Sequence, residues 1–222
     1  IDVGIAEEHA ITYAAGLSAA GFKPIVPIYS TFMQRAYDHI SHDALLQELP
    51  LIYCMDRDGL VGADGPTHHG VFDLSFMSSL PNMIVSAPKD GNELRNLLAT
   101  AIQLNKCFSI RYPKDSSRNF DLYGQPQLIE IGKWEILHRG IHDAIIAVGS
   151  MVGLIEDQKD TIYKELGYLP TIINARFIKP LDRELLLELC LTHEHIITIE
   201  EGALAGGFGS AVSTFLHDNG LD

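Results

Sequence analysis

Residues 1–10 form the stretch Ile1-Asp2-Val3-Gly4-Ile5-Ala6-Glu7-Glu8-His9-Ala10, in which a short apolar run passes through glycine into a sequence typical of a helix. The same succession recurs along the chain. Short apolar runs such as residues 51–55 predict strands, and longer stretches such as residues 90–105 predict helices. The apolar runs are nearly continuous instead of alternating with polar residues, which is typical of parallel strands covered on both faces. The sequence therefore predicts an α/β fold.

Two consecutive parallel-sheet α/β units are expected, residues 1–112 and 128–222, because residues 113–127 are polar, rich in turn formers and typical of a linker. In the first unit we expect strands at residues 1–3, 24–29, 51–55, 83–86 and 108–111, and helices at 7–20, 31–48, 74–79 and 90–105. In the second we expect strands at residues 132–137, 144–148, 171–175 and 196–200, and helices at 152–166, 183–191 and 209–216.

Charge and hydropathy exclude two classes of partner. The formal net charge is −13 and the chain has no Lys/Arg cluster, so we expect no nucleic-acid binding. No apolar run reaches the roughly 18–20 residues of a membrane-spanning helix, so we expect no membrane partner. In so acidic a chain, a phosphate site has to be built locally from a few Arg or His side chains.

Glu7 is the first candidate for chemistry. It follows the expected strand at residues 1–3, and ligands of parallel α/β sheets bind at the carboxyl ends of the strands. Its apolar neighbours Ile5, Ala6 and Ala10 predict partial burial, which favours the protonated, hydrogen-donating form of a carboxyl. A glutamate in the first turn of a helix also simply complements the helix dipole. From these residues alone, both interpretations stay open.

A second group of candidates lies in the stretch Tyr29-Ser30-Thr31-Phe32-Met33-Gln34-Arg35-Ala36-Tyr37, at a junction between strand and helix. An aromatic face there suits a flat heterocycle, because it buries area and determines orientation. The alternative is that the aromatic residues belong to the core and that Arg35 is a surface cation.

The third group of candidates lies in a long loop, Asp56-Arg57-Asp58-Gly59-Leu60-Val61-Gly62-Ala63-Asp64-Gly65-Pro66-Thr67-His68-His69-Gly70. Long loops after a buried strand are typical of functional sites, although a solvated loop without a role stays open. A metal site at Asp64, His68 and His69 is disfavoured, because adjacent His side chains seldom point at one ion and no thiolate is near. Arg111 ends a predicted strand and either faces the ligand crevice or pairs with an acid of the linker.

Several of these motifs together resemble the transketolase family of thiamine diphosphate enzymes. Three stretches resemble its pyrimidine-binding domain: Gly4 to Ala10, Ala15-Gly16-Leu17, and Asp64-Gly65-Pro66-Thr67-His68. Arg176-Phe177-Ile178-Lys179-Pro180-Leu181-Asp182 and the glycine-rich residues 200–210 resemble its C-terminal domain. The resemblance implies that thiamine diphosphate is the cofactor. It also implies that Glu7 binds a ring nitrogen of the aminopyrimidine, Phe32 stacks on that ring and Ile5 contacts it.

The motif Asp56-Arg57-x-Gly59-Leu60-Val61-Gly62-Ala63 resembles one branch of the family. That branch joins pyruvate, with decarboxylation, to glyceraldehyde 3-phosphate, and forms 1-deoxy-D-xylulose 5-phosphate for isoprenoid, thiamine and pyridoxal synthesis. The substrate contacts that the resemblance implies are Tyr29 and Arg35 at a polar end, Arg57 and Arg111 at the phosphate, and Asp64 and His68 at acceptor hydroxyl and phosphate groups, with His68 also catalytic. Two residues depart from the family pattern: Asp58, usually Ala, and Glu8, usually Gln. Asp58 places a negative charge beside Arg57.

The family's diphosphate-binding domain, with its Gly-Asp-Gly motif and Mg²⁺ ligands, has no counterpart in these residues. We therefore expect a fragment with half of a cofactor site, inactive alone and with no metal ligands of its own. The resemblance further implies a homodimer in the bacterial cytoplasm, and a plastid location also fits. The alternatives are a transketolase that moves a two-carbon ketol unit and a non-catalytic dimerisation module. The beta chain of a 2-oxo-acid dehydrogenase is disfavoured by residues 64–69.

Overall fold

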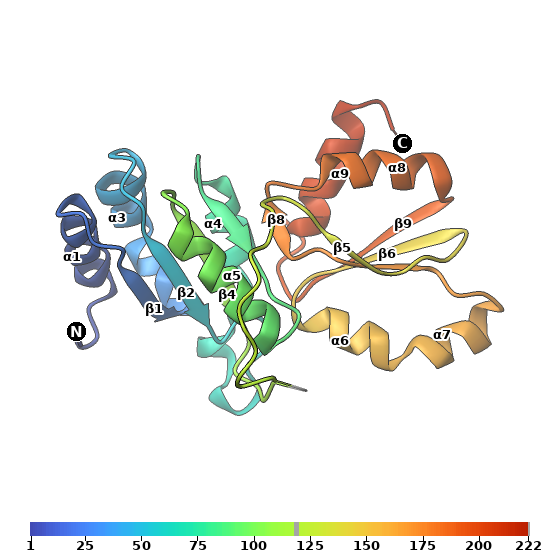
Figure 1. Cartoon of the computed structure of the whole chain (residues 1–222), viewed down its shortest axis with the longest axis horizontal. Coiled ribbons are helices and arrows are strands. Elements are labelled where there is room, and N and C mark those ends of the chain that lie inside the picture. Colours follow the sequence, from blue (N-terminus) through green and yellow to red (C-terminus); the bar gives the residue numbers. More distant parts are fainter. Residues whose placement is uncertain (118–119, 222) are drawn as a thin grey trace.

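The first sheet holds the strands of the first half of the chain in the order β1-β2-β4-β3-β8 (Figure 1). The structure is a computed structural model, and it describes residues 1–117 and 120–221. The strands of this sheet are β1 (Ile25–Tyr29), β2 (Ile52–Asp56), β3 (Ile84–Ser86), β4 (Phe108–Tyr112) and β8 (Phe177–Lys179). The first four pair in parallel, as predicted, whereas β8 from the second half pairs antiparallel with β3.

Helices and short turns connect these strands. They are α1 (Glu7–Ala19), α2 (Ser30–Met33), the 3-10 turn η1 (Gln34–Ala36), α3 (Tyr37–His39), the π-helical η2 (Ile40–Leu45), the 3-10 turns η3 (Gly62–Asp64) and η4 (Pro66–His68), α4 (Asp73–Ser79) and α5 (Gly91–Gln103). Asp90 begins α5 because its side chain accepts a hydrogen bond of 2.8 Å from the amide of Glu93.

The second sheet has the order β5-β7-β6-β9. Its elements are β5 (Glu135–His138), β6 (Asp143–Ala147), α6 (Ser150–Asp157), α7 (Lys159–Leu166), β7 (Thr171–Asn174), α8 (Arg183–Thr192), β9 (His195–Ile199) and α9 (Phe208–Asp218). The strands β7, β6 and β9 are parallel, whereas β5 pairs antiparallel with β7. The helices α6 and α7 lie on one face of this sheet and α8 and α9 on the other (Figure 1). Both sheets are therefore dominated by parallel strands, which confirms the predicted fold class.

Some predicted elements differ from the structure. Residues 1–3 form no strand, and Ile1 is 94% exposed. The helix predicted for residues 31–48 is broken into α2, η1, α3 and η2, and the one predicted for residues 152–166 divides at Gln158. The strand β8 was not predicted, because three residues before Pro180 are too short to show a period.

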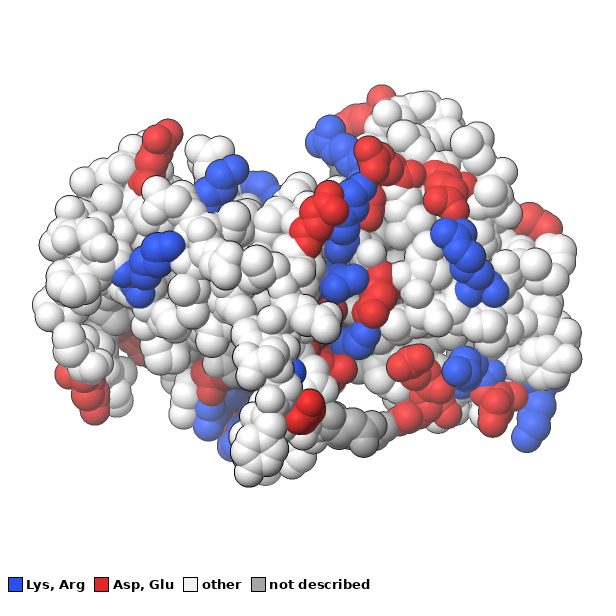
Figure 2. Space-filling model, viewed as in Figure 1, with Lys and Arg blue, Asp and Glu red and all other residues white. Residues whose placement is uncertain are grey.

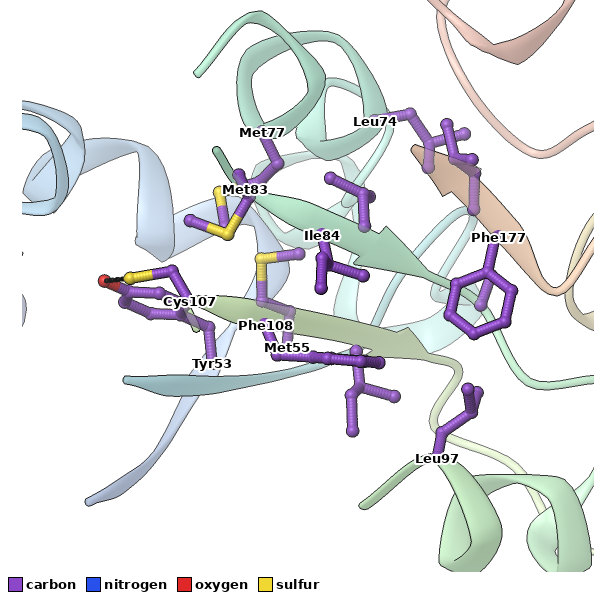
Figure 3. Close-up of a cluster of buried hydrophobic side chains, with 14 of the residues drawn as sticks. Tyr53, Met55, Leu74, Met77, Met83, Ile84, Leu97, Cys107, Phe108 and Phe177 are labelled. Atoms are coloured by element: carbon purple, nitrogen blue, oxygen red, sulfur yellow. Dashed lines mark hydrogen bonds between the residues drawn. The ribbon is translucent and has the colours of Figure 1, made fainter. Parts of the chain in front are cut away.

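The hydrophobic core joins the two halves of the chain. Phe177 of β8 and Phe108 of β4 are fully buried, with ring centroids 6.3 Å apart (Figure 3). Tyr53, Met77 and Met83 extend the same cluster toward the far end of the strands (Figure 3). Because β8 adds a strand and an aromatic side chain to the first sheet, the second half of the chain is packed directly onto the sheet that carries the candidate residues.

Surface charge is mixed. On the face drawn in Figure 2, Lys and Arg side chains lie among Asp and Glu side chains rather than in one continuous patch. Within the described part of the chain, none of the helices combines the length and the apolar character needed to cross a membrane.

Candidate functional site

Three neighbouring strands of the first sheet end at the same level. In the parallel ladder, Tyr29 at the end of β1 lies beside Asp56 of β2, and Asp56 lies beside Tyr112 of β4. The segments that follow these residues therefore leave the sheet at one edge. That edge is the carboxyl end of parallel strands, where α/β proteins bind ligands.

Glu7 lies in the first turn of α1 and is 7% exposed. Its carboxyl oxygens both lie 3.3 Å from Nη1 of Arg35, whose side chain is 49% exposed. Arg35 in turn lies over the ring of Phe32, with Cζ 4.9 Å from the ring centroid. Phe32 belongs to α2 and Arg35 to the η1 turn that continues it, and residues three apart in a helical run lie on the same side. The buried carboxyl of Glu7 thus contacts the cation of Arg35, which in turn contacts the ring of Phe32.

A second group of side chains, here called the outer cluster, consists of Tyr29, Arg57, Asp64, His68 and Lys114. The guanidinium of Arg57 lies 3.8 Å from the centroid of the Tyr29 ring. Arg57 also pairs with Asp56 and, through Nε at 3.3 Å, with Asp64. Nζ of Lys114 donates to both oxygens of Asp64, at 3.0 and 2.9 Å. Hydrogen bonds from Lys114, and then Arg57, lower the pKa of the Asp64 carboxyl.

Phe32 connects the acid to the outer cluster. Its ring stacks on Tyr29 with centroids 5.5 Å apart, and it makes a T-shaped contact with the ring of His68, with centroids 5.3 Å apart. His68 ends the turn η4, and its Nδ1 lies 2.9 Å from the hydroxyl of Thr67. The structure therefore brings Glu7, Tyr29, Phe32, Arg35, Arg57, Asp64 and His68 to one continuous surface.

Arg111 does not reach this surface. It is 1% exposed, and its guanidinium pairs with Asp73 at 2.8 Å and Asp58 at 3.2 Å. Its Nη2 also donates to the backbone carbonyl of Glu201 at 3.0 Å. Arg111 lies within β4 beside Ser109 and Ile110, which are also buried, and its guanidinium binds carboxylates of the protein instead of facing the crevice.

Lys114 takes the place at the outer cluster for which Arg111 was predicted. It was not among the predicted site residues because it lies in the stretch interpreted as a linker. The signal was available: Lys114 follows the end of β4 by two residues, and a cation just beyond a strand's carboxyl end faces the ligand crevice. The same linker interpretation covers residues 118 and 119, which lie outside the described residues.

The two remaining candidates lie apart from these contacts. Ile5 is 90% exposed just before α1, with its side chain in solvent. His69 binds the backbone of its own loop, because its Nδ1 accepts a hydrogen bond of 3.2 Å from the amide of Val61. In residues 1–117 and 120–221, no three His, Cys, Asp or Glu side chains are grouped so as to hold a metal ion.

The glycine-rich residues 202–209 form a tight turn at the start of α9. Oxygens of the Glu200 carboxylate accept hydrogen bonds from the amides of Phe208 at 2.8 Å and Gly209 at 2.9 Å. A Cβ at Gly207 would lie 2.4 Å from the carbonyl oxygen of Ala203, so the turn requires glycine. The protein's own carboxylate therefore fills the place that an anion would take at this helix start.

Comparisons with known proteins match both halves of the chain. The family model "Transketolase, pyrimidine binding domain" matches residues 1–119, and "Transketolase, C-terminal domain" matches residues 132–222. A 1-deoxy-D-xylulose-5-phosphate synthase of Syntrophus aciditrophicus is 50% identical over 99% of this chain, which covers 34% of that protein. A 1-deoxy-D-xylulose-5-phosphate synthase 1 of Geobacter sulfurreducens is 52% identical, with the same coverages. The chain spans about a third of the length of the curated relatives it matches.

A solved structure described as "Split gene transketolase, inactive beta4 tetramer" superposes with a TM-score of 0.87. It is 28% identical, and the match covers 98% of this chain and 70% of that one. The chain therefore belongs to the transketolase family and consists of a pyrimidine binding domain followed by a transketolase C-terminal domain.

Proposed function

We propose that this chain is part of a thiamine-diphosphate-dependent enzyme that joins pyruvate, with loss of carbon dioxide, to glyceraldehyde 3-phosphate and releases 1-deoxy-D-xylulose 5-phosphate. One observation carries the proposal: Phe32 links the buried carboxyl of Glu7 to an outer cluster with two cations, Arg57 and Lys114. A flat nitrogen heterocycle and a phosphorylated aldehyde have the shapes and charges that these two groups suit. The names of the curated relatives support the same product.

The cofactor fits the residues that are present. Glu7 is buried, and within the described residues its one partner is the half-exposed Arg35, whose long side chain is free to move away. The ring of Phe32 is partly exposed beside it. Glu7 would hold a proton at a ring nitrogen of the aminopyrimidine and Phe32 would stack on that ring. When bound, thiamine diphosphate supplies the carbon nucleophile and the electron sink. We place Mg²⁺ and the diphosphate on residues outside this chain.

The outer cluster binds the acceptor in this proposal. Arg57 and Lys114 bind the phosphate, and both are positioned by their contacts with Asp64. His68 lies at the edge of Phe32, between the cofactor and the cations, where it exchanges a proton with an oxygen of the acceptor. Tyr29 orients Arg57 by stacking, and Arg35 faces the polar end of the donor.

We further propose that residues 1–112 and 128–222 act as two domains of a homodimer, that the enzyme works in the bacterial cytoplasm, and that its product feeds isoprenoid, thiamine and pyridoxal synthesis. We also propose that these residues alone are inactive. The split gene transketolase, which is similar to this chain over nearly its whole length, is described as an inactive assembly, and this supports the proposal.

The full-length protein tests the reaction. With pyruvate and glyceraldehyde 3-phosphate we expect carbon dioxide release and formation of 1-deoxy-D-xylulose 5-phosphate. A transketolase, which the solved neighbour favours, would instead transfer a ketol unit from a ketose phosphate without carbon dioxide. Absence of both activities in folded, cofactor-loaded protein would favour the non-catalytic module and refute the proposal.

A further inference from the structure

Arg57 and Asp58 are adjacent in sequence and point in opposite directions. Arg57 has φ of 59° and its side chain lies outward over Tyr29. Asp58 is 2% exposed and lies inward, 3.2 Å from Arg111. A positive φ is uncommon for a residue with a side chain, and it persists where the surroundings over-determine the backbone. The orientation of Arg57 therefore depends on what holds the backbone beside it.

The surroundings of Asp58 come from three elements. The charged groups that face it are Arg111 of β4, Asp73 at the start of α4 and Glu201 after β9. Arg111 is the single cation among them. Asp58 Oδ1 is buried and, within the described residues, has no hydrogen-bond partner. The position of the Asp58 carboxyl is thus set by Arg111, which Asp73 and the carbonyl of Glu201 hold in place.

The backbone next to Asp58 leaves little freedom. Gly59 and Gly70 exchange two hydrogen bonds, of 3.0 and 2.9 Å. A Cβ at Gly59, where φ is 62°, would lie 2.8 Å from a carboxyl oxygen of Glu201. The amide of Asp58 donates to the carbonyl of Tyr112 at 3.2 Å. Directly beside the peptide of Arg57, Asp58 is thus held at its amide by β4 and at its carboxyl by Arg111.

From these contacts we propose that Asp58 is a positioning residue, whose ion pair with Arg111 anchors the loop from inside and thereby holds Arg57 in place for the acceptor phosphate. This inference rests on the proposed function for the identity of the phosphate ligand. Its structural part, the anchoring of the loop, does not. A buried ion pair adds little net stability, but it defines one geometry, which is what a positioning role requires.

The test compares Asp58→Ala and Asp58→Asn in the full-length protein. Asn keeps a side-chain oxygen at the place of Asp58 Oδ2, which lies 3.2 Å from Nη1 of Arg111, whereas Ala removes the contact. For Asp58→Ala we expect KM for glyceraldehyde 3-phosphate to rise about tenfold, with kcat and KM for pyruvate within about twofold of wild type. For Asp58→Asn we expect a much smaller rise in KM for glyceraldehyde 3-phosphate than for Asp58→Ala. With glyceraldehyde, which has no phosphate, the two variants and wild type should have equal kcat/KM.

Hydrogen exchange gives a second readout that needs no activity. We expect the amides of Gly59 and Gly70 to exchange faster in Asp58→Ala than in Asp58→Asn or wild type. Equal losses with both aldehydes, or unchanged exchange at these two amides, would overturn the positioning role. If wild-type protein made no 1-deoxy-D-xylulose 5-phosphate, the proposed function would fail, and the exchange comparison would still decide whether Asp58 anchors the loop.

Discussion

The guanidinium of Arg57 lies 3.8 Å from the centre of the Tyr29 ring, so the loop after β2 stacks on the last residue of β1. Both residues leave the sheet at the same level because Tyr29 and Asp56 are neighbours in the parallel ladder. The stacked cation has one face on an aromatic ring and its Nε on Asp64. Arg57 is consequently held in a defined place while part of its edge stays open to solvent.

Comparing Tyr29→Phe with Tyr29→Ala distinguishes the contribution of the Tyr29 ring to acceptor binding from that of its hydroxyl. Stacking of a cation on a ring contributes about 0.5–2 kcal/mol, and Phe keeps most of it. We expect Tyr29→Ala to raise KM for glyceraldehyde 3-phosphate by roughly three- to thirtyfold, and Tyr29→Phe to change it by less than about twofold. Steady-state kinetics of the full-length enzyme with varied acceptor check this. A large effect of Phe would assign the hydroxyl, instead of the ring, to substrate binding.

Lys114→Ala removes the second cation of the outer cluster. Its loss leaves Asp64 with Arg57 alone, and we expect KM for the phosphorylated acceptor to rise about tenfold because a charge-assisted contact is lost. The matched variant Lys114→Arg keeps the charge and should stay near wild type. Kinetics with glyceraldehyde serve as the control, since an acceptor without phosphate should not distinguish the three proteins.

We expect Arg111→Met to lower the free energy of unfolding instead of weakening acceptor binding directly. It leaves Asp58 and Asp73 buried without their cation, and breaking a buried pair in this way costs about 3–5 kcal/mol. Arg139→Met is the control, because the side chain of Arg139 is 68% exposed and its pair with Glu188 contributes at most about 1 kcal/mol. Urea unfolding of both variants measures the difference. Equal stability would contradict the structural role of Arg111.

The stability of the folded state should depend on pH through Asp58. Burial, opposed by Arg111 and reinforced by Asp73 and Glu201, raises the pKa of the Asp58 carboxyl to about 7. An unfolded Asp has a pKa of ~3.9. The contribution of the protonated Asp58 carboxyl to the free energy of unfolding is therefore complete below that pH and is lost as pH rises through about 7. Between pH 5.5 and 8, wild type should lose ~2 kcal/mol relative to Asp58→Asn.

Unfolding in urea at the two pH values checks this pH dependence. Glu165→Gln, on the exposed surface of α7, is a matched control that should show no such change relative to wild type. A pH-independent difference between wild type and Asp58→Asn would show that Asp58 is ionised throughout, with its charge satisfied by Arg111.

Glu7→Gln tests the acid that would bind the cofactor. Gln keeps the length and can still accept a hydrogen bond from Arg35, but it cannot exchange a proton. We expect kcat to fall by about 10²–10⁴ with unchanged folding, which is the usual contribution of a positioned acid or base. Near-normal kcat with intact folding would leave Glu7 only its role at the helix start.

Much of the candidate site was predictable, because it lies in short local motifs. The acid at the start of α1, the aromatic group at residues 29–32 and the loop at residues 56–70 each have a composition that is unusual for a core element. The strand predicted for residues 1–3 and the continuous helix at 31–48 were wrong. Apolar composition alone does not supply a pairing partner to a strand, nor does it show where a helical stretch breaks into α2, η1, α3 and η2.

The sequence by itself determined the α/β class, the order of the two units and the family, because these depend on local periodicity and on motifs that are contiguous in the chain. Only the tertiary structure decided between Arg111 and Lys114. The register of β1, β2 and β4 places Arg111 inside the ladder, beside Met55, and places Lys114 two residues beyond the end of β4. That register sends Arg111 inward to Asp58 and Asp73 and leaves Lys114 outside on Asp64, since cations are placed by the carboxylates that the fold brings near them.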